Sequence, residues 1–288
     1  MSKKISILEL QQKKESGQPI TMLTAYDYPS ATLVDEAGTD IILVGDSVAM
    51  TVLGHDDTTA VTMEEMLHHC RAVKRGANHA ILVGDMPFMS YQISKEEAIR
   101  NAGRFIKEAG MDTVKLEGGR EISETVRAII NAGIPVMGHL GLTPQTATKL
   151  GGYKVQAKTA DSAKRIMEDA LALQEVGCYA IVIEAVPALV AETVTKSLHI
   201  PTIGIGAGVH CDGQVLVFHD MLGLFDRFTP KFVKRYTNLR PHILNALRSF
   251  NEEVAARQFP TQAHSFKMDE AEMELFLYGS KDSSGKTA

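Results

Sequence analysis

Four acidic residues follow short, mostly apolar segments of the kind that form buried β-strands. The acids are Asp46, Asp85, Glu117 and Glu184, after segments 41–45, 80–84, 114–116 and 180–183. In a barrel of parallel strands, the carboxyl ends of the strands open onto one mouth, where active sites lie. The sequence therefore predicts that four carboxylates from distant positions meet in one site.

Gathered carboxylates need compensation, because like charges held away from water repel one another. A cation, a shared proton or a paired Lys or Arg would supply it. Oxygen ligands without clustered His or Cys favour a hard cation, and Mg²⁺ fits because it takes one or two carboxylates and leaves positions for substrate oxygens. For each acid taken singly, capping of the next loop or helix stays an open alternative.

Lys115 stands two residues before Glu117, and the two-residue period of a strand points both side chains to the same side of the sheet. We expect that side to be the barrel interior, with Val114 and Leu116 facing the helices. A Lys among acids can neutralise them, hold a substrate carboxylate, form a Schiff base or make only a structural salt bridge.

Ser47 and His139 also stand at the ends of predicted strands, where each could contact a ligand or merely cap a loop. The glycine-rich segment 201–208 follows the seventh predicted strand, where barrels often hold a phosphate. It lacks the spacing of the dinucleotide-binding fingerprint, so its glycines indicate close backbone approach rather than a particular ligand.

The elements that would position these residues alternate along the chain. The predicted strands are Ile20–Thr24, Ile41–Gly45, Ala80–Gly84, Thr113–Leu116, Ile134–Gly138, Ala180–Ile183, Thr202–Ile205 and Gln214–Val217. Glycines suited to end the intervening helices are Gly38, Gly76, Gly110, Gly133 and Gly177. This alternation predicts an α/β protein with a (β/α)8 TIM barrel, and a doubly wound open sheet is the alternative.

The pattern changes beyond about Phe225, where helical periodicity covers 230–250 and 251–258. We therefore predict a single barrel domain over residues 1–265 with additional C-terminal helices. The extension 266–288 is expected to be partly disordered, because Gly279–Ala288 is polar and built of small residues.

Composition excludes several classes of function. The 288 residues carry 30 basic and 35 acidic side chains, a net charge of −5, which gives no general attraction to nucleic acid or anionic membranes. No apolar segment approaches the roughly 18 residues of a membrane span, and the first 17 residues lack an export signal, so we expect a cytoplasmic protein. Cys70, Cys178 and Cys211 are far apart and predict reduced thiols.

Eight short motifs occur in a recognisable order between about residue 18 and His264. They are Thr24–Tyr28, Val44–Ser47, Asp85–Phe88, Val114–Gly119, Gly138–Gln145, Gly151–Gln156, Ile203–Gly208 and Cys211–Leu216. In these motifs the chain resembles the 3-methyl-2-oxobutanoate hydroxymethyltransferase family, also called the ketopantoate hydroxymethyltransferases. One departure is Ala157, where the family usually has glycine.

The resemblance implies a Mg²⁺-dependent TIM-barrel enzyme of pantothenate biosynthesis. Such an enzyme transfers a hydroxymethyl group from 5,10-methylenetetrahydrofolate to 3-methyl-2-oxobutanoate, giving 2-dehydropantoate. The metal ligands it implies are Asp46, Asp85 and, in the inner or outer shell, Glu117. We assign substrate contacts to Asp46, Ser47, Asp85, Lys115 and His139. Glu184 would be the proton acceptor, and the resemblance also implies a homodecamer.

This chemistry is coherent, because a 2-oxo acid can chelate Mg²⁺ through its carboxylate and keto oxygens and the ion then stabilises an enolate. Glu184, on another strand, would remove the C3 proton. One alternative is a Mg²⁺-dependent 2-oxo acid lyase of the isocitrate lyase and phosphoenolpyruvate mutase type, although the Lys-Lys-Cys-Gly-His loop of isocitrate lyases is missing from the sequence. The others are a metal-free aldolase using a Lys115 Schiff base and a binding barrel without turnover.

Overall fold

The structure, a computed structural model, describes residues 3–148 and 151–279. The chain divides into two compact units, residues 1–237 and 238–288. The first unit holds every strand and helices α1 to α9, and the second holds α10 and α11. The predicted division into a barrel domain, 1–265, and an extension, 266–288, stays a prediction.

Eight parallel strands close into a barrel in chain order, and β1 pairs with β8. The strands are β1 Ile20–Thr24, β2 Ile41–Val44, β3 Ile81–Asp85, β4 Thr113–Glu117, β5 Val136–Gly141, β6 Ala180–Glu184, β7 Thr202–Ile205 and β8 Gly213–Leu216. This confirms the predicted (β/α)8 barrel, and the doubly wound alternative is wrong.

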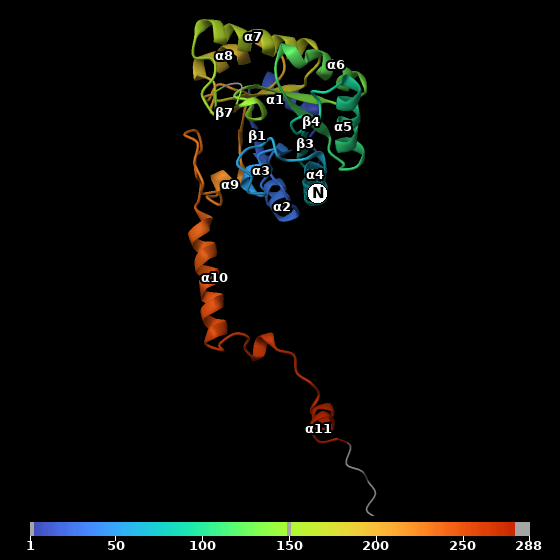
Figure 1. Cartoon of the computed structure of the whole chain (residues 1–288), viewed down its shortest axis with the longest axis vertical. Helices are drawn as coiled ribbons and strands as arrows, with labels where there is room; N and C mark the ends of the chain where they lie inside the picture. The colour runs from blue at the N-terminus through green and yellow to red at the C-terminus, as the bar shows by residue number, and fades with distance from the viewer. Residues whose placement is uncertain (1–2, 149–150, 280–288) are drawn as a thin grey trace, which may run out of the picture. The chain divides into compact units, whose positions relative to one another are not determined.

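The helices of the first unit surround the strands in Figure 1. They are α1 Ile7–Glu15, α2 Tyr28–Glu36, α3 Val48–Thr51, α4 Met63–Gly76, α5 Lys95–Lys107, α6 Ser123–Asn131, α7 Ala160–Glu175, α8 Ala188–Ser197 and α9 Phe218–Met221. The second unit contains α10 Leu239–Ala255 and α11 Glu270–Tyr278. No helix within the described ranges is both long and apolar enough to cross a membrane.

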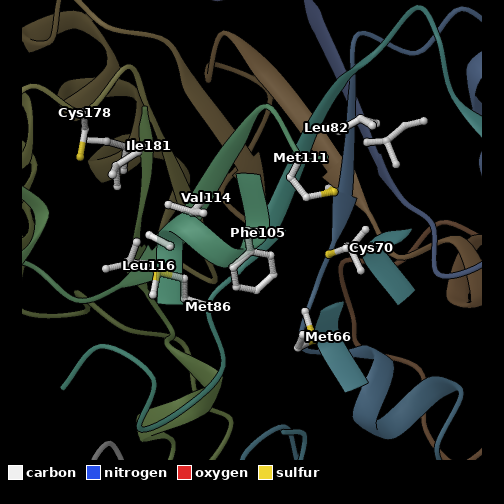
Figure 2. Close-up of a cluster of buried hydrophobic side chains, with 14 of the residues drawn as sticks. Met66, Cys70, Leu82, Met86, Phe105, Met111, Val114, Leu116, Cys178 and Ile181 are labelled. Atoms are coloured by element: carbon white, nitrogen blue, oxygen red, sulfur yellow. The ribbon is translucent and has the colours of Figure 1, made fainter. Parts of the chain in front are cut away.

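Two apolar layers hold the barrel. Inside it, residues such as Met22, Leu43 and Val182 form one buried cluster. Between strands and helices lies a second cluster, which includes Val114 and Leu116 as expected. Figure 2 shows part of this second layer around the Phe105 ring. Alternate strand residues therefore serve the two layers, and the polar site residues occupy inward positions at the strand ends.

Phe105 of α5 explains the glycine that precedes Asp85. A Cβ on Gly84 would lie 2.4 Å from the Phe105 ring, so only glycine lets the helix pack this closely on β3. The ring is fully buried in the same apolar cluster as Met86 and Leu116. The residue before a site carboxylate is thus dictated by packing on the helix side of the sheet.

Helix α1 lies against the amino ends of the strands. Leu10 is fully buried in the cluster inside the barrel. Lys13 Nζ lies 2.5 Å from Asp40 Oδ1, just before β2, and Lys14 Nζ lies 2.7 Å from Asp212 Oδ2, just before β8. The barrel is therefore covered at the end opposite to the carboxyl ends of its strands.

Several local expectations need correction. β5 begins at Val136 rather than at Ile134, because Pro135 has no N–H to give to the sheet. Gly38, Gly110, Gly133 and Gly177 have positive φ as expected, but Gly76 ends α4 within the helix. A Cβ on Gly76 would lie 2.6 Å from Tyr28 O, so this glycine permits close packing of α4 against α2.

The C-terminal expectations are met only in part. A single helix, α10, begins at Leu239, and 230–238 is not helical although helical periodicity starts at Pro230. The extension 266–288 contains α11, which the sequence pattern did not predict. The predicted disorder of the last residues falls on 280–288, outside the described residues.

Candidate active site

A cavity of about 380 Å³ opens at the carboxyl ends of the strands. Every site residue predicted from the sequence lines it: Asp46, Ser47, Asp85, Lys115, Glu117, His139 and Glu184. The four carboxylates thus meet as expected, although they come from β3, β4, β6 and the residue two positions past β2.

Asp46, Asp85, Lys115 and Glu117 form a polar group with Asp85 at its centre. Its Oδ2 accepts a hydrogen bond from the Asp46 amide at 3.1 Å, and its Oδ1 lies 2.8 Å from Lys115 Nζ. Lys115 Nζ is also 3.9 Å from Glu117 Oε1. Lys115 and Glu117 point into the cavity from alternate positions of β4, as the strand period predicts. These residues are at most 5% exposed, so water screens their charges little.

Burial and the neighbouring charges shift the pKa values of the side chains in the polar group. Burial, together with the charges of Asp85 and Glu117, raises the pKa of Asp46 well above its ordinary value. Burial also raises the pKa of Asp85. Burial opposes the Lys115 ammonium, but the charges of the three carboxylates outweigh it and raise its pKa. A lysine kept protonated in this way is a poor amine nucleophile, which argues against the Schiff-base alternative.

His139 connects two of the acids. Its Nδ1 lies 3.3 Å from Glu117 Oε1 and its Nε2 lies 3.2 Å from Glu184 Oε2. Burial and the charge of Lys115 lower the pKa of His139, but the nearby carboxylates of Glu117 and Glu184 outweigh them and raise it to about 9. His139 lies within β5 rather than at its end, and it is placed to orient Glu184.

The raised pKa of His139 predicts a pH-dependent stability for the metal-free enzyme. Because the folded-state pKa lies above the ordinary value of 6.5, the stabilisation is fully present below pH 6.5 and is lost as the pH rises through about 9. We expect the free energy of unfolding to fall by as much as about 3 kcal/mol over this range. Urea unfolding in EDTA at several pH values measures it.

His139→Gln is the control for this pH dependence, because glutamine keeps hydrogen-bonding capacity and does not titrate. The variant should show a flatter profile between pH 6.5 and 9. Parallel profiles for the two proteins would show that His139 does not carry this proton.

Sequence reasoning missed Gln145, which connects two of the predicted metal ligands. Its Nε2 donates to Asp46 Oδ2 at 3.0 Å and to Met86 O at 3.0 Å, and its backbone N–H donates to Glu117 Oε2 at 3.0 Å. Because both partners of Nε2 are acceptors, the amide is oriented uniquely. Tyr91 O–H lies 2.8 Å from Gln145 Oε1 and donates to it.

Other neighbours fix Glu184 and Ser47. Gly141 has φ of 96°, and a Cβ there would lie 2.1 Å from Glu184 O, so glycine lets β5 approach the end of β6. Leu142 N–H donates to the same oxygen at 2.9 Å. Ser47 Oγ lies 2.7 Å from Tyr26 O–H. Gly141 and Gln145 both fall in the motif Gly138–Gln145, which was the available signal for them.

Ala157, the departure from the family pattern, has a positive φ. Its φ is 56°, in the left-handed region that favours glycine, and it is 6% exposed. The preceding residue, Gln156, donates its N–H to Ala185 O at 2.9 Å and so ties this loop to the end of β6. Ala157 thus has a backbone conformation that glycine adopts with less strain.

The carboxylates offer oxygens suited to a divalent cation. Asp85 Oδ1 and Glu117 Oε1 are buried and receive no hydrogen bond of good geometry from the described residues. No three His, Cys, Asp or Glu side chains in residues 3–148 and 151–279 are placed to bind one ion together. The two open carboxylate oxygens, Asp85 Oδ1 and Glu117 Oε1, are the kind of hard ligand that Mg²⁺ takes, one or two at a time, from a protein.

A closed parallel barrel with buried acids and a lysine at its carboxyl-end mouth is the architecture of a (β/α)8-barrel enzyme. A family model described as ketopantoate hydroxymethyltransferase matches residues 4–262. The chain therefore belongs to the ketopantoate hydroxymethyltransferase family. It is an enzyme of pantothenate biosynthesis that transfers a hydroxymethyl group to 3-methyl-2-oxobutanoate.

Individual relatives agree with this assignment. The 3-methyl-2-oxobutanoate hydroxymethyltransferase of Heliobacterium modesticaldum is 56% identical over 96% of this chain and 100% of its own length. That of Syntrophus aciditrophicus is 58% identical over 92% of this chain and 97% of its own. The resemblance stated from the motifs is confirmed.

Solved structures share the fold at low sequence identity. Phosphonopyruvate hydrolase aligns with a TM-score of 0.60 and 14% identity over 96% of this chain and 95% of that chain. A complex of phosphonopyruvate hydrolase with oxalate and Mg²⁺ aligns with a TM-score of 0.59 and 13% identity over 94% of this chain and 98% of that chain. 2,3-Dimethylmalate lyase, of the phosphoenolpyruvate mutase and isocitrate lyase superfamily, aligns with a TM-score of 0.57 and 16% identity over 93% of this chain and 92% of that chain. These likenesses concern the fold alone. They fit the lyase alternative, but they do not outweigh the match to the hydroxymethyltransferase family.

Proposed function

We propose that the buried carboxylates bind a divalent cation, Mg²⁺ in particular, and that 5,10-methylenetetrahydrofolate is the one-carbon donor. The observation that carries the metal proposal is the group of three buried carboxylates, Asp46, Asp85 and Glu117, against one lysine. The phosphonopyruvate hydrolase complex, which contains Mg²⁺ and oxalate on the same fold, supports it.

Asp46 and Asp85 would be the direct ligands, and Glu117 would act through a water. A bound divalent ion would supply Lewis-acid stabilisation of the negative charge that develops on the oxygens of a 2-oxo acid. Lys115 would pair with the substrate carboxylate, because its ammonium is held protonated in the cavity. Ser47 lines the same cavity and would donate a hydrogen bond to the substrate.

Glu184 would be the base that takes the C3 proton of 3-methyl-2-oxobutanoate. Its carboxylate lines the cavity from β6, apart from the β3 and β4 acids, and His139 contacts it at 3.2 Å. The carbanion at C3 then forms a bond to the methylene carbon of the donor. Water supplies the hydroxyl oxygen, and both C–N bonds of that methylene end as N–H bonds of tetrahydrofolate. The C3 proton lost to Glu184 and the two water protons balance the reaction.

Loss of the C3 proton signal of 3-methyl-2-oxobutanoate in D₂O tests the metal and base proposals together. We expect exchange with Mg²⁺, none in EDTA, and recovery on adding Mg²⁺. If exchange is absent, the experiment is repeated with methylenetetrahydrofolate, since enolisation could require the second substrate. Absence in both conditions, or equal rates with and without EDTA, would contradict the proposal.

The assembly and location are further proposals. We infer a homodecamer in the cytoplasm from the family resemblance. Analytical ultracentrifugation of the full chain measures the assembly, and cell fractionation measures the location.

A further inference from the structure

The cavity that contains the polar group is also lined by aromatic side chains. Tyr153, Phe225, Phe228 and Phe232 line this aromatic region. Phe228 is 47% exposed and Tyr153 is 50% exposed. Large aromatic side chains left half-exposed at the rim of a polar site are typical of surfaces that a ligand covers.

The segment 225–232, which carries the three phenylalanines and forms one wall of the cavity, contacts the rest of the barrel on both sides. Arg227 donates to Gly54 O at 2.7 Å and to His55 O at 3.1 Å. Phe232 packs against Gly206, where a Cβ would lie 2.7 Å from the ring. The glycine-rich segment 201–208 thus makes room for a side chain of this wall. The aromatic region is therefore largely formed before any ligand arrives.

Two exposed lysines line the cavity next in sequence to these aromatic residues. Lys154 follows Tyr153, and Lys231 precedes Phe232. Asp220 also lines the cavity, and burial raises its pKa to about 6. A ligand that spans the region would meet aromatic faces beside the polar group and ammonium groups toward solvent.

The cavity is also larger than one small acid requires. Its volume of about 380 Å³ falls in the range of sites that hold drug-sized molecules. 3-Methyl-2-oxobutanoate is a five-carbon acid whose oxygens would be held at the polar group. The second reactant must bring its methylene carbon to C3 of that acid, so it must occupy adjoining space.

We propose that the aromatic region is the donor subsite, in which the flat reduced pterin contacts Tyr153 and Phe228 and the acidic tail pairs with Lys154 and Lys231. This inference rests on the proposed function, in which the donor is a methylenetetrahydrofolate. Stacking on aromatic rings recognises a flat heterocycle, and ammonium groups recognise carboxylates.

Two variants test the subsite: Phe228→Leu, and Lys154→Ala combined with Lys231→Ala. For each we expect the KM for methylenetetrahydrofolate and the dissociation constant for tetrahydrofolate to rise about tenfold. The KM for 3-methyl-2-oxobutanoate and the donor-free rate of C3-proton exchange should change less than about twofold, because the polar group is untouched. Kinetics, calorimetry and NMR supply these values.

Tyr236→Leu and Lys234→Ala are the matched controls. Both residues lie in the first unit, Tyr236 is 62% exposed, and neither lines the cavity. An unchanged KM and dissociation constant for the folates in both test variants would overturn the inference. A loss of C3-proton exchange equal to the loss in donor affinity would also overturn it. A wild-type enzyme that neither exchanges the C3 proton nor binds tetrahydrofolate would instead contradict the proposed function.

Discussion

Replacing Glu184 by Gln is expected to slow C3-proton exchange by about 10²–10⁴-fold, the usual contribution of a positioned general base. Glutamine keeps the shape and hydrogen-bonding capacity of the side chain but cannot take the proton. Glu184 is the last residue of β6 and lines the cavity, and its side chain is 15% exposed. His139 Nε2 lies 3.2 Å from its Oε2. NMR in D₂O with Mg²⁺ measures the rate.

Binding of a divalent cation should survive this substitution, because Glu184 is not among the proposed ligands. Titration with Mn²⁺, followed by electron paramagnetic resonance, should give an affinity within about threefold of wild type. Glu192→Gln, on α8 and paired with Lys196, is the control for a lost surface carboxylate. Undiminished exchange in Glu184→Gln would remove this residue as the base.

Replacing Gln145 by Leu is expected to weaken Mn²⁺ binding by about 10–100-fold, even without substrate. The side-chain amide holds Asp46 Oδ2, so its loss leaves that carboxylate without its donor and free to turn away. The backbone bond to Glu117 persists in the variant. Electron paramagnetic resonance of Mn²⁺ gives the dissociation constant independently of turnover.

Two further variants separate this effect from a general loss of stability. Tyr91→Phe removes the hydroxyl that donates to Gln145 Oε1, so it should weaken Mn²⁺ binding in the same direction by a smaller factor. Gln11→Leu lies on α1, far from the mouth, and should bind Mn²⁺ as wild type does. Normal Mn²⁺ affinity in a folded Gln145→Leu protein would show that the amide does not position Asp46.

The sequence predicted the parts of the site that depend on strand period and strand ends. Lys115 and Glu117 face one side because they are two residues apart, and Asp85 and Glu184 line the mouth because their strands end there. These relations are local, and closing eight parallel strands into one barrel makes them converge. The candidate site could therefore be assembled before any distance was known.

The residues that were missed depend on contacts between distant segments. Gln145 is recognisable only once Asp46, Met86 and Glu117 surround it. Tyr91 is recognisable only through its hydrogen bonds with Gln145 and with the backbone of Glu117. The same reason explains why the role of Gly76 was not predicted. This glycine allows α4 to pack closely against α2 and does not form a left-handed turn after α4. Spacing along the chain carries no record of such neighbours, which only packing of the whole barrel supplies.

The pairing of β1 with β8 bears on how the chain folds. Ile20 pairs with Gly213, and Lys14 of α1 reaches Asp212 just before β8. These contacts join the two strands that are most distant in the sequence. The loop-closure entropy lost when β1 pairs with β8 is therefore large, and the contacts that offset it form late in folding. On the ribosome, the early strands emerge with an unpaired edge until residues near 216 are available. The nascent barrel is thus most exposed to aggregation just before its last strand is made.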